Sequence, residues 1–189
     1  MKNIVAFCFI FLAVLAVYFG AYLPYTKSKM YIGAVQTKIS GFDQLKSIYD
    51  QVFSFYSPIG DEESVKFLLN SIDGWAANPA NAANEAGVRQ LVSYIETKIF
   101  ENNPRHLLLM ANIYSNFWRQ FNKDEDFEKA VDYYRRILVI GPNLPHALYS
   151  LLSLYIQADQ PAEVREISER ILQLWPGDEG VKKILSKTN

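Results

Sequence analysis

The two histidines are the first residues to consider as metal ligands or proton carriers. His106 and His146 each lie at the start of a predicted helix, and neither has a second ligand four residues further on. Two ligands one helical turn apart are the usual arrangement for zinc on a helix. We therefore interpret both as solvated histidines and expect neither a metal site nor a cofactor.

Two groups of acidic residues could supply a general acid and base. They are the run 124–126 and the stripe Glu163, Glu166 and Glu169. A helix N-terminus favours the first group, and a solvent-facing helix surface explains the second. Phosphate-loop, G-x-S-x-G and H-E-x-x-H motifs are missing, and the only cysteine, Cys8, lies in an apolar segment. We predict that the protein is not an enzyme.

Composition restricts the partners. The chain has 189 residues, half of them apolar, with 19 basic and 20 acidic side chains and a net charge of −1. This balance lacks the basic surface typical of nucleic-acid binders, so we expect no nucleic-acid partner. The apolar share suffices for a folded core.

The N-terminal segment 1–25 is predicted to be a transmembrane anchor. Every residue of Ile4–Leu23 except Gly20 is apolar, and 20 helical residues span roughly 30 Å, the thickness of the hydrocarbon core. A signal peptide is the alternative, but its apolar region is shorter, and Phe19 occupies a position where cleavage needs a small residue. We expect Pro24 to end the helix. Three tyrosines are predicted to lie at the far interface: Tyr18, Tyr22 and Tyr25.

Two arguments about the side of the membrane point in opposite directions. Lys27, Lys29 and Lys38 outnumber Lys2, and the positive-inside rule then favours a cytoplasmic C-terminal part. A very short N-terminal tail before the apolar segment instead resembles bacterial signal anchors, which export the rest of the chain. We expect a single-pass protein of the bacterial inner membrane with an extracytoplasmic soluble part.

Beyond the anchor, apolar residues recur at helical spacing, and no window alternates as a strand does, so the fold class is predicted to be all-α. Segment 26–77 is a membrane-proximal helical region. We predict helices there over 29–37 and 42–55, and a third that Asp61 caps and that ends near Trp75. The Asn/Ala/Pro-rich segment 78–84 is predicted to be a linker, and 85–189 to hold helical repeats with a C-terminal capping helix.

An internal period indicates a repeat. Pro142 and Pro176 are 34 residues apart, the period of the tetratricopeptide repeat, a helix-turn-helix unit that stacks into an α-solenoid. The second unit resembles that family's signature at Leu148, Leu151, Leu152, Tyr155, Val164, Ser168 and Pro176. The first unit resembles it at Leu107, Met110, Ala111, Tyr114, Ala130, Tyr134 and Pro142.

The sequence departs from the repeat pattern between the two helices of the first unit. Seven additional residues, around 117–121, are predicted to extend this hairpin. Asn122 and Glu125 match a capping box that would start the second helix. After Pro176, Val181 and the apolar residues beyond it predict a short capping helix.

The resemblance implies a binding groove on the first helix of each unit, suited to a peptide's backbone and carboxylate groups. A merely solvated surface is the alternative. The residues implied are Arg105, Leu108, Asn112, Ser115 and Asn116 from the first unit, and His146, Tyr149, Ser153, Ile156 and Gln157 from the second.

These observations predict a membrane-anchored scaffold that binds a protein or peptide partner in the cell envelope. A second resemblance offers an alternative. The anchor, the short helix from Lys29, the segment 42–72 with its Pro-Ile-Gly-Asp-Glu-Glu loop, and the repeats resemble the C-terminal end of bacterial O-antigen ligase and polymerase proteins. That likeness implies an accessory or detached part in envelope polysaccharide assembly, partnered with an integral membrane glycosyl-transfer protein.

Overall fold

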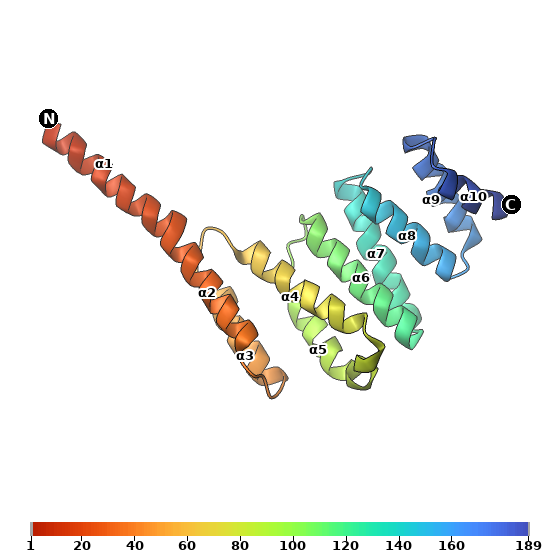
Figure 1. The fold of residues 1–189 in the computed structure, drawn as a ribbon, viewed down its shortest axis with the longest axis horizontal. Helices are drawn as coiled ribbons and strands as arrows, with labels where there is room; N and C mark the ends of the chain where they lie inside the picture. The colour runs from red at the N-terminus through yellow and green to blue at the C-terminus, as the bar shows by residue number, and fades with distance from the viewer. Residues whose placement is uncertain (1, 189) are drawn as a thin grey trace. The chain divides into compact units, whose positions relative to one another are not determined.

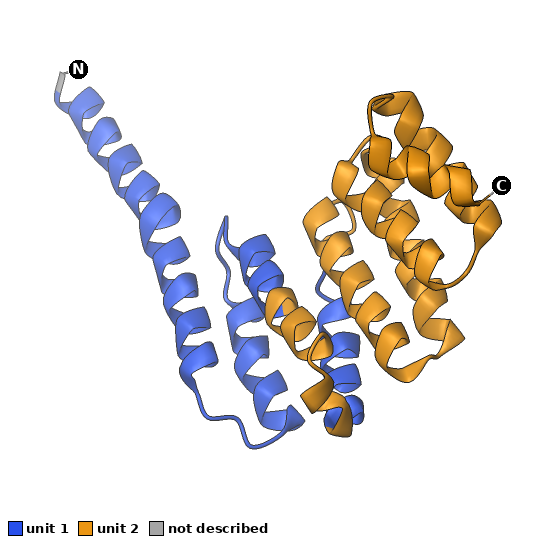
Figure 2. Cartoon of the chain, turned by 45° about the vertical axis from the view of Figure 1, so that its right-hand side comes forward, with its two compact units in different colours: residues 1–68, 84–99 blue, residues 69–83, 100–189 orange. Residues whose placement is uncertain are grey.

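The computed structural model describes residues 2–188, and within that range it contains helices and no strands. The all-α prediction is confirmed. The chain forms two compact units, which Figure 2 distinguishes by colour: unit 1 comprises Met1–Leu68 and Asn84–Ile99, and unit 2 comprises Leu69–Ala83 and Phe100–Asn189.

The N-terminal helix is longer than predicted. Helix α1 (Lys2–Val17) continues through a π-helical turn, η1 (Tyr18–Tyr22), into α2 (Leu23–Gln36), as Figure 1 shows. The stretch Asn3–Gln36 is long and apolar enough to cross a membrane, although a signal sequence would pass the same test. The helix predicted over 29–37 is therefore the end of α2 and not a separate element.

The prediction that Pro24 ends the helix is wrong, and the π turn explains why. Proline lacks an N–H group, and its ring collides with the carbonyl four residues earlier in a regular α-helix. Here the chain widens just before the proline, because the Leu23 N–H donates to the Tyr18 carbonyl, five residues back. Such π turns accommodate an additional residue and let the helix continue.

Unit 1 continues with α3 (Phe42–Ser54), α4 (Asp61–Ala76), which ends in unit 2, and α5 (Glu85–Glu96). The predicted apolar stripes of α3 and α5 form much of its core. The buried members are Leu45, Tyr49 and Val52 of α3, and Val88, Leu91, Val92, Tyr94 and Ile95 of α5.

Asp61 does not cap α4 as expected. The helix begins at Asp61, and the Gly60 carbonyl accepts the Ser64 N–H, so the cap position falls to Gly60. Gly60 has a φ of 104°, a left-handed conformation that glycine adopts without strain. The Asp61 carboxylate instead pairs with Lys27.

The segment predicted as a linker contains a 3₁₀ helix, η2 (Pro79–Asn84). The Asn78 side chain accepts the Ala80 N–H and so stabilises its first turn.

In unit 2, α6 (Pro104–Phe121) and α7 (Asp124–Ile140) form a closely packed hairpin. Helices α8 (Pro145–Gln157) and α9 (Pro161–Leu174) form a second hairpin, and α10 (Glu179–Lys187) packs on α9. Pro142 and Pro176 each lie two residues beyond the helix that precedes them, α7 and α9 respectively. Proline disfavours helical conformation in the residue before it, which explains these matching ends.

Two predictions about the first hairpin have different outcomes. The residues 117–121 extend α6, as expected. The capping box at Asn122 is wrong, because Asn122 has a φ of 51° and follows the end of α6, where its N–H donates to the Trp118 carbonyl. Asparagine tolerates this left-handed conformation, which terminates helices. Lys123 then takes the N-cap position of α7 without a side-chain cap.

Candidate functional site

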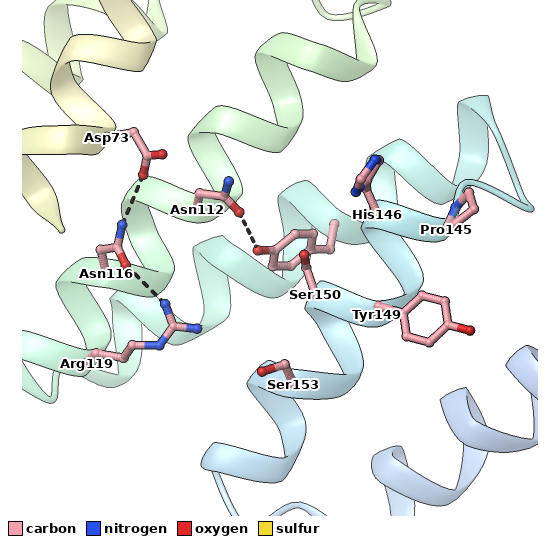
Figure 3. A pocket seen from close by; sticks show the side chains of 10 residues that line it. Asp73, Asn112, Asn116, Arg119, Pro145, His146, Tyr149, Ser150 and Ser153 are labelled. Carbon is pink, nitrogen blue, oxygen red and sulfur yellow. Dashed lines mark hydrogen bonds between the residues drawn. The ribbon is translucent and has the colours of Figure 1, made fainter. Parts of the chain in front are cut away.

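A polar groove of about 600 Å³ lies within unit 2 (Figure 3). It lies between the first helices of the two hairpins, α6 and α8, and the end of α4 and one α7 side chain complete it. Its lining residues are Asp73, Asn112, Asn116, Arg119, Tyr134, Pro145, His146, Tyr149, Ser150 and Ser153.

A chain of hydrogen bonds crosses one side of the groove. The Asn116 Nδ2 donates to Asp73 Oδ1 at 3.0 Å, and Arg119 Nη1 donates to Asn116 Oδ1 at 3.0 Å (Figure 3). Arg119 Nε then donates to Gln157 Oε1 at 2.7 Å. The chain therefore holds the Arg119 guanidinium in place between α6 and α8. Among the hydrogen bonds of residues 2–188, none uses its Nη2, which leaves that amino group for a ligand.

The charged ends of this chain differ in environment. Burial raises the pKa of the Asp73 carboxyl, and the hydrogen bond from Asn116 opposes the shift only in part. Arg119 is exposed. The groove therefore presents a solvent-facing cation beside a carboxylate that is costly to ionise.

A second hydrogen bond fixes the opposite amide. The Tyr134 hydroxyl donates to Asn112 Oδ1 at 2.8 Å. Tyr134 is buried, which raises the pKa of its hydroxyl and keeps it a donor. The bond orients Asn112 so that its Nδ2 remains available to donate.

At the α8 side, Tyr149 provides an aromatic edge. Its ring stacks on Trp175, with centroids 6.0 Å apart. Its hydroxyl donates to Asp178, whose pKa is thereby lowered. The same carboxylate caps α10 by accepting the Val181 N–H.

Five of the ten predicted groove residues line this groove: Asn112, Asn116, His146, Tyr149 and Ser153. The other five do not line it: Arg105, Leu108, Ser115, Ile156 and Gln157.

These five differ in what they do instead. Ser115 is buried, and its hydroxyl donates to the Ala111 carbonyl one helical turn earlier. Gln157 contacts Arg119 and so supports the groove from its edge. Arg105 and Ile156 are exposed, and Leu108 is half-buried.

The groove also contains residues that the sequence prediction missed. Arg119 and Ser150 follow the helical spacing of 112, 116 and 146, 153, so the spacing on α6 and α8 could have identified them. Asp73 lies on α4 and Tyr134 on α7, and no periodicity connects either of them to α6. Only the tertiary fold brings them to the groove.

The prediction for the histidines is right for one and wrong for the other. His146 is exposed and lines the groove. His106 is completely buried, and its Nδ1 accepts the Phe100 N–H at 3.1 Å. The loop before α6 turns back over the imidazole, and the Phe100 ring packs edge-on against it. His106 therefore has a structural role that its position at a helix start did not indicate.

A second hollow, of about 590 Å³, lies within unit 1 between α3 and α5. Three cations line it, and two of them pair with carboxylates of their own helix: Lys46 with Asp50, and Arg89 with Glu85. The hydrogen bond from Lys46 lowers the pKa of Asp50. This local pairing reduces the charge that a ligand would meet.

Among the described residues, no group of His, Cys, Asp and Glu side chains could hold a metal ion. No protein-family model matches this sequence, and no curated protein or solved structure is detectably similar to it.

Proposed function

We propose that this chain is a single-pass membrane protein of the bacterial envelope whose segment 85–189 is a tetratricopeptide-like solenoid. In this proposal the groove between α6 and α8 recruits an extended polypeptide segment, and the protein acts as a scaffold by binding and not by catalysis.

The observation that carries the proposal is the set of unsatisfied donors in the groove. The Arg119 Nη2, the Asn112 Nδ2 and the exposed His146 imidazole border the same hollow. Amide and guanidinium donors suit backbone carbonyls and carboxylates, the groups that an extended peptide offers. The donors on α6 are already held by protein contacts, which lowers the entropy cost of binding.

The helix ends support the repeat assignment. Helices α7 and α9 end at Ile140 and Leu174, 34 residues apart, as Pro142 and Pro176 are. Each hairpin contacts its successor in sequence, through α7 with α8 and α9 with α10. Neighbour-to-neighbour stacking of this kind is what a solenoid requires.

Site-specific photo-crosslinking in the native host tests the recruitment. A photoreactive phenylalanine analogue in place of Tyr149 is expected to form one discrete adduct. The matched control is the same analogue in place of Val139, which lies on α7 outside the groove and is 82% exposed. We expect no adduct there.

The identity of the adduct decides between the two classes of partner. Mass spectrometry of the crosslinked fragment is expected to show amino-acid residues, and Arg119→Glu is expected to abolish the adduct. Sugar residues in the fragment would replace the peptide proposal with the polysaccharide-assembly alternative. Equal adducts from positions 149 and 139 would refute a specific groove.

Reporter fusions test the proposed sidedness. A reporter active only outside the cytoplasm and one active only inside it are fused separately after residue 189. We expect activity of the first alone. Activity of the second alone would place the groove with cytoplasmic partners.

A further inference from the structure

The loop between α3 and α4, residues 55–60, exposes two large apolar side chains. Tyr56 is 68% exposed and Ile59 is 63% exposed. In both views of unit 1 this loop lies beside the long N-terminal helix, at the end of α3 toward α1 (Figures 1 and 2).

Both ends of this loop are attached to α2 at one residue. The Lys27 Nζ donates to the Phe55 carbonyl at 2.8 Å, and it also pairs with the Asp61 carboxylate. Lys27 is 1% exposed. A lysine so deeply buried is stable only when it is paired, so these two contacts fix the loop at the level of Lys27.

That level is the end of the apolar stretch. Leu23, its last residue, is 7% exposed and lies one helical turn before Lys27 on the same face. The side chains of residues 3–22 are exposed, apart from the half-buried Leu15. Cover by the rest of unit 1 therefore begins at Leu23. Four residues of helix rise about 6 Å, so the loop lies within one turn of the predicted hydrocarbon boundary.

The loop's own bonds leave its apolar side chains on the outside. Ser57 is buried, and its hydroxyl donates to the Ile59 carbonyl at 2.6 Å. Gly60 then takes a φ of 104°, which reverses the chain into α4. The polar Ser57 is therefore inside and its apolar neighbours are outside, the reverse of a loop suited to water alone.

The turn at the other end of α3 provides a comparison. Its apolar residue, Ile39, is 36% exposed and lies between Lys38 and Ser40. From Lys27 to Gln36, the end of α2, the helix rises roughly 14 Å away from the apolar stretch. The more exposed apolar side chains are therefore at the end of unit 1 nearest the predicted bilayer.

We propose that the loop 55–60 inserts Tyr56 and Ile59 into the interfacial layer of the bilayer that α1 crosses. This rests on the proposed membrane anchorage. A tyrosine ring is stable there because its face contacts lipid while its hydroxyl reaches water. A second contact beside the span would restrain rotation of unit 1 about the anchor axis.

Nitroxide accessibility in the full chain tests this. Cys8→Ala removes the only native cysteine, and a spin-labelled cysteine is placed in turn at Val14, Ile39 or Ile59. The chain is reconstituted into nanodiscs of equal parts phosphatidylcholine and phosphatidylglycerol. Relaxation by oxygen, which concentrates in lipid, is compared with relaxation by a water-soluble nickel chelate. Ile39→Cys is the matched control, since it is an isoleucine in the other loop that borders α3.

We expect oxygen to dominate at positions 14 and 59 and nickel to dominate at position 39. Nickel dominance at position 59 with oxygen dominance at 14 would overturn the loop insertion and leave the anchor intact. Low accessibility to both reagents at 59 would also overturn it, because a protein surface would then cover the loop. Nickel dominance at 14 would refute the anchor itself. Helical circular dichroism of each variant verifies folding.

Discussion

The two hairpins of unit 2 follow one spacing with different side chains, and each builds its core differently. In α6–α7, Tyr114 stacks on Tyr133, with centroids 5.9 Å apart, and also contacts Phe117. In α8–α9 the core is largely aliphatic: Leu148, Leu151, Leu152, Leu154, Val164, Ile167 and Ile171.

One pair of positions shows what the difference costs. Tyr134 and Ser168 are 34 residues apart, and both are buried. The Tyr134 hydroxyl reaches Asn112 at the groove. The Ser168 Oγ has no hydrogen-bond partner among the described residues. The repeat spacing therefore preserves the position in the fold, whereas the polar contact depends on the length of the side chain.

The largest expected effect is on the aromatic core. Phe117→Ala is expected to lower the free energy of unfolding by about 4 kcal/mol, because it removes a buried ring and leaves a cavity. Leu151→Ala in the aliphatic hairpin is expected to cost about 3 kcal/mol. Urea unfolding of the detergent-solubilised chain measures both. A larger loss for Leu151→Ala would reverse the assigned importance of the two cores, and Val139→Ala serves as the exposed control.

The next largest effect is on the hydrogen bond between Tyr134 and the groove. Tyr134→Phe is expected to cost about 1 kcal/mol. Asn112→Ala should then add little further loss, because both substitutions remove the same bond. A double-mutant cycle on the same unfolding assay measures this coupling. Fully additive losses would show that the bond contributes nothing to stability.

Ser168→Ala should have the opposite sign. Removing a buried hydroxyl without a partner is expected to raise the free energy of unfolding by about 0.5–1 kcal/mol. The measurement is the shift of the urea midpoint at constant slope. A loss of stability instead would mean that the hydroxyl makes a contact of its own.

The smallest effect is a difference in pH dependence between carboxylates beside the two hairpins. The pKa of Asp73 is raised in the folded chain, so stability falls as pH rises from the ordinary aspartate range toward that raised value. The pKa of Asp178 is lowered, so its contribution is present above the ordinary range and is lost as pH falls through the lowered value.

Unfolding profiles of the isosteric variants separate these two contributions. Relative to wild type, Asp73→Asn should become less stable, and Asp178→Asn more stable, as pH falls through the range near 4. Parallel curves for the three proteins would contradict both assigned shifts.

Local patterns predicted the helices well and several contacts poorly. The ends of α7 and α9 were predictable because Pro142 and Pro176 act on the adjacent backbone. The burial of His106 and Lys27 was not, because it depends on loops that return from elsewhere in the fold. Half of the predicted groove lies on the groove because α6 and α8 have regular spacing. Asp73 was missed because α4 contributes it from outside that spacing.

The π turn before Pro24 also sets an angle. One residue beyond the regular repeat shifts everything after it by about 100° around the helix axis. The azimuth of α1 relative to the covered face at Leu23 and Lys27 therefore depends on the single additional residue in η1. Deleting one residue within Tyr18–Tyr22 would restore an α-helical register. It would turn a different row of apolar side chains beneath unit 1, although the composition of both segments would hardly change.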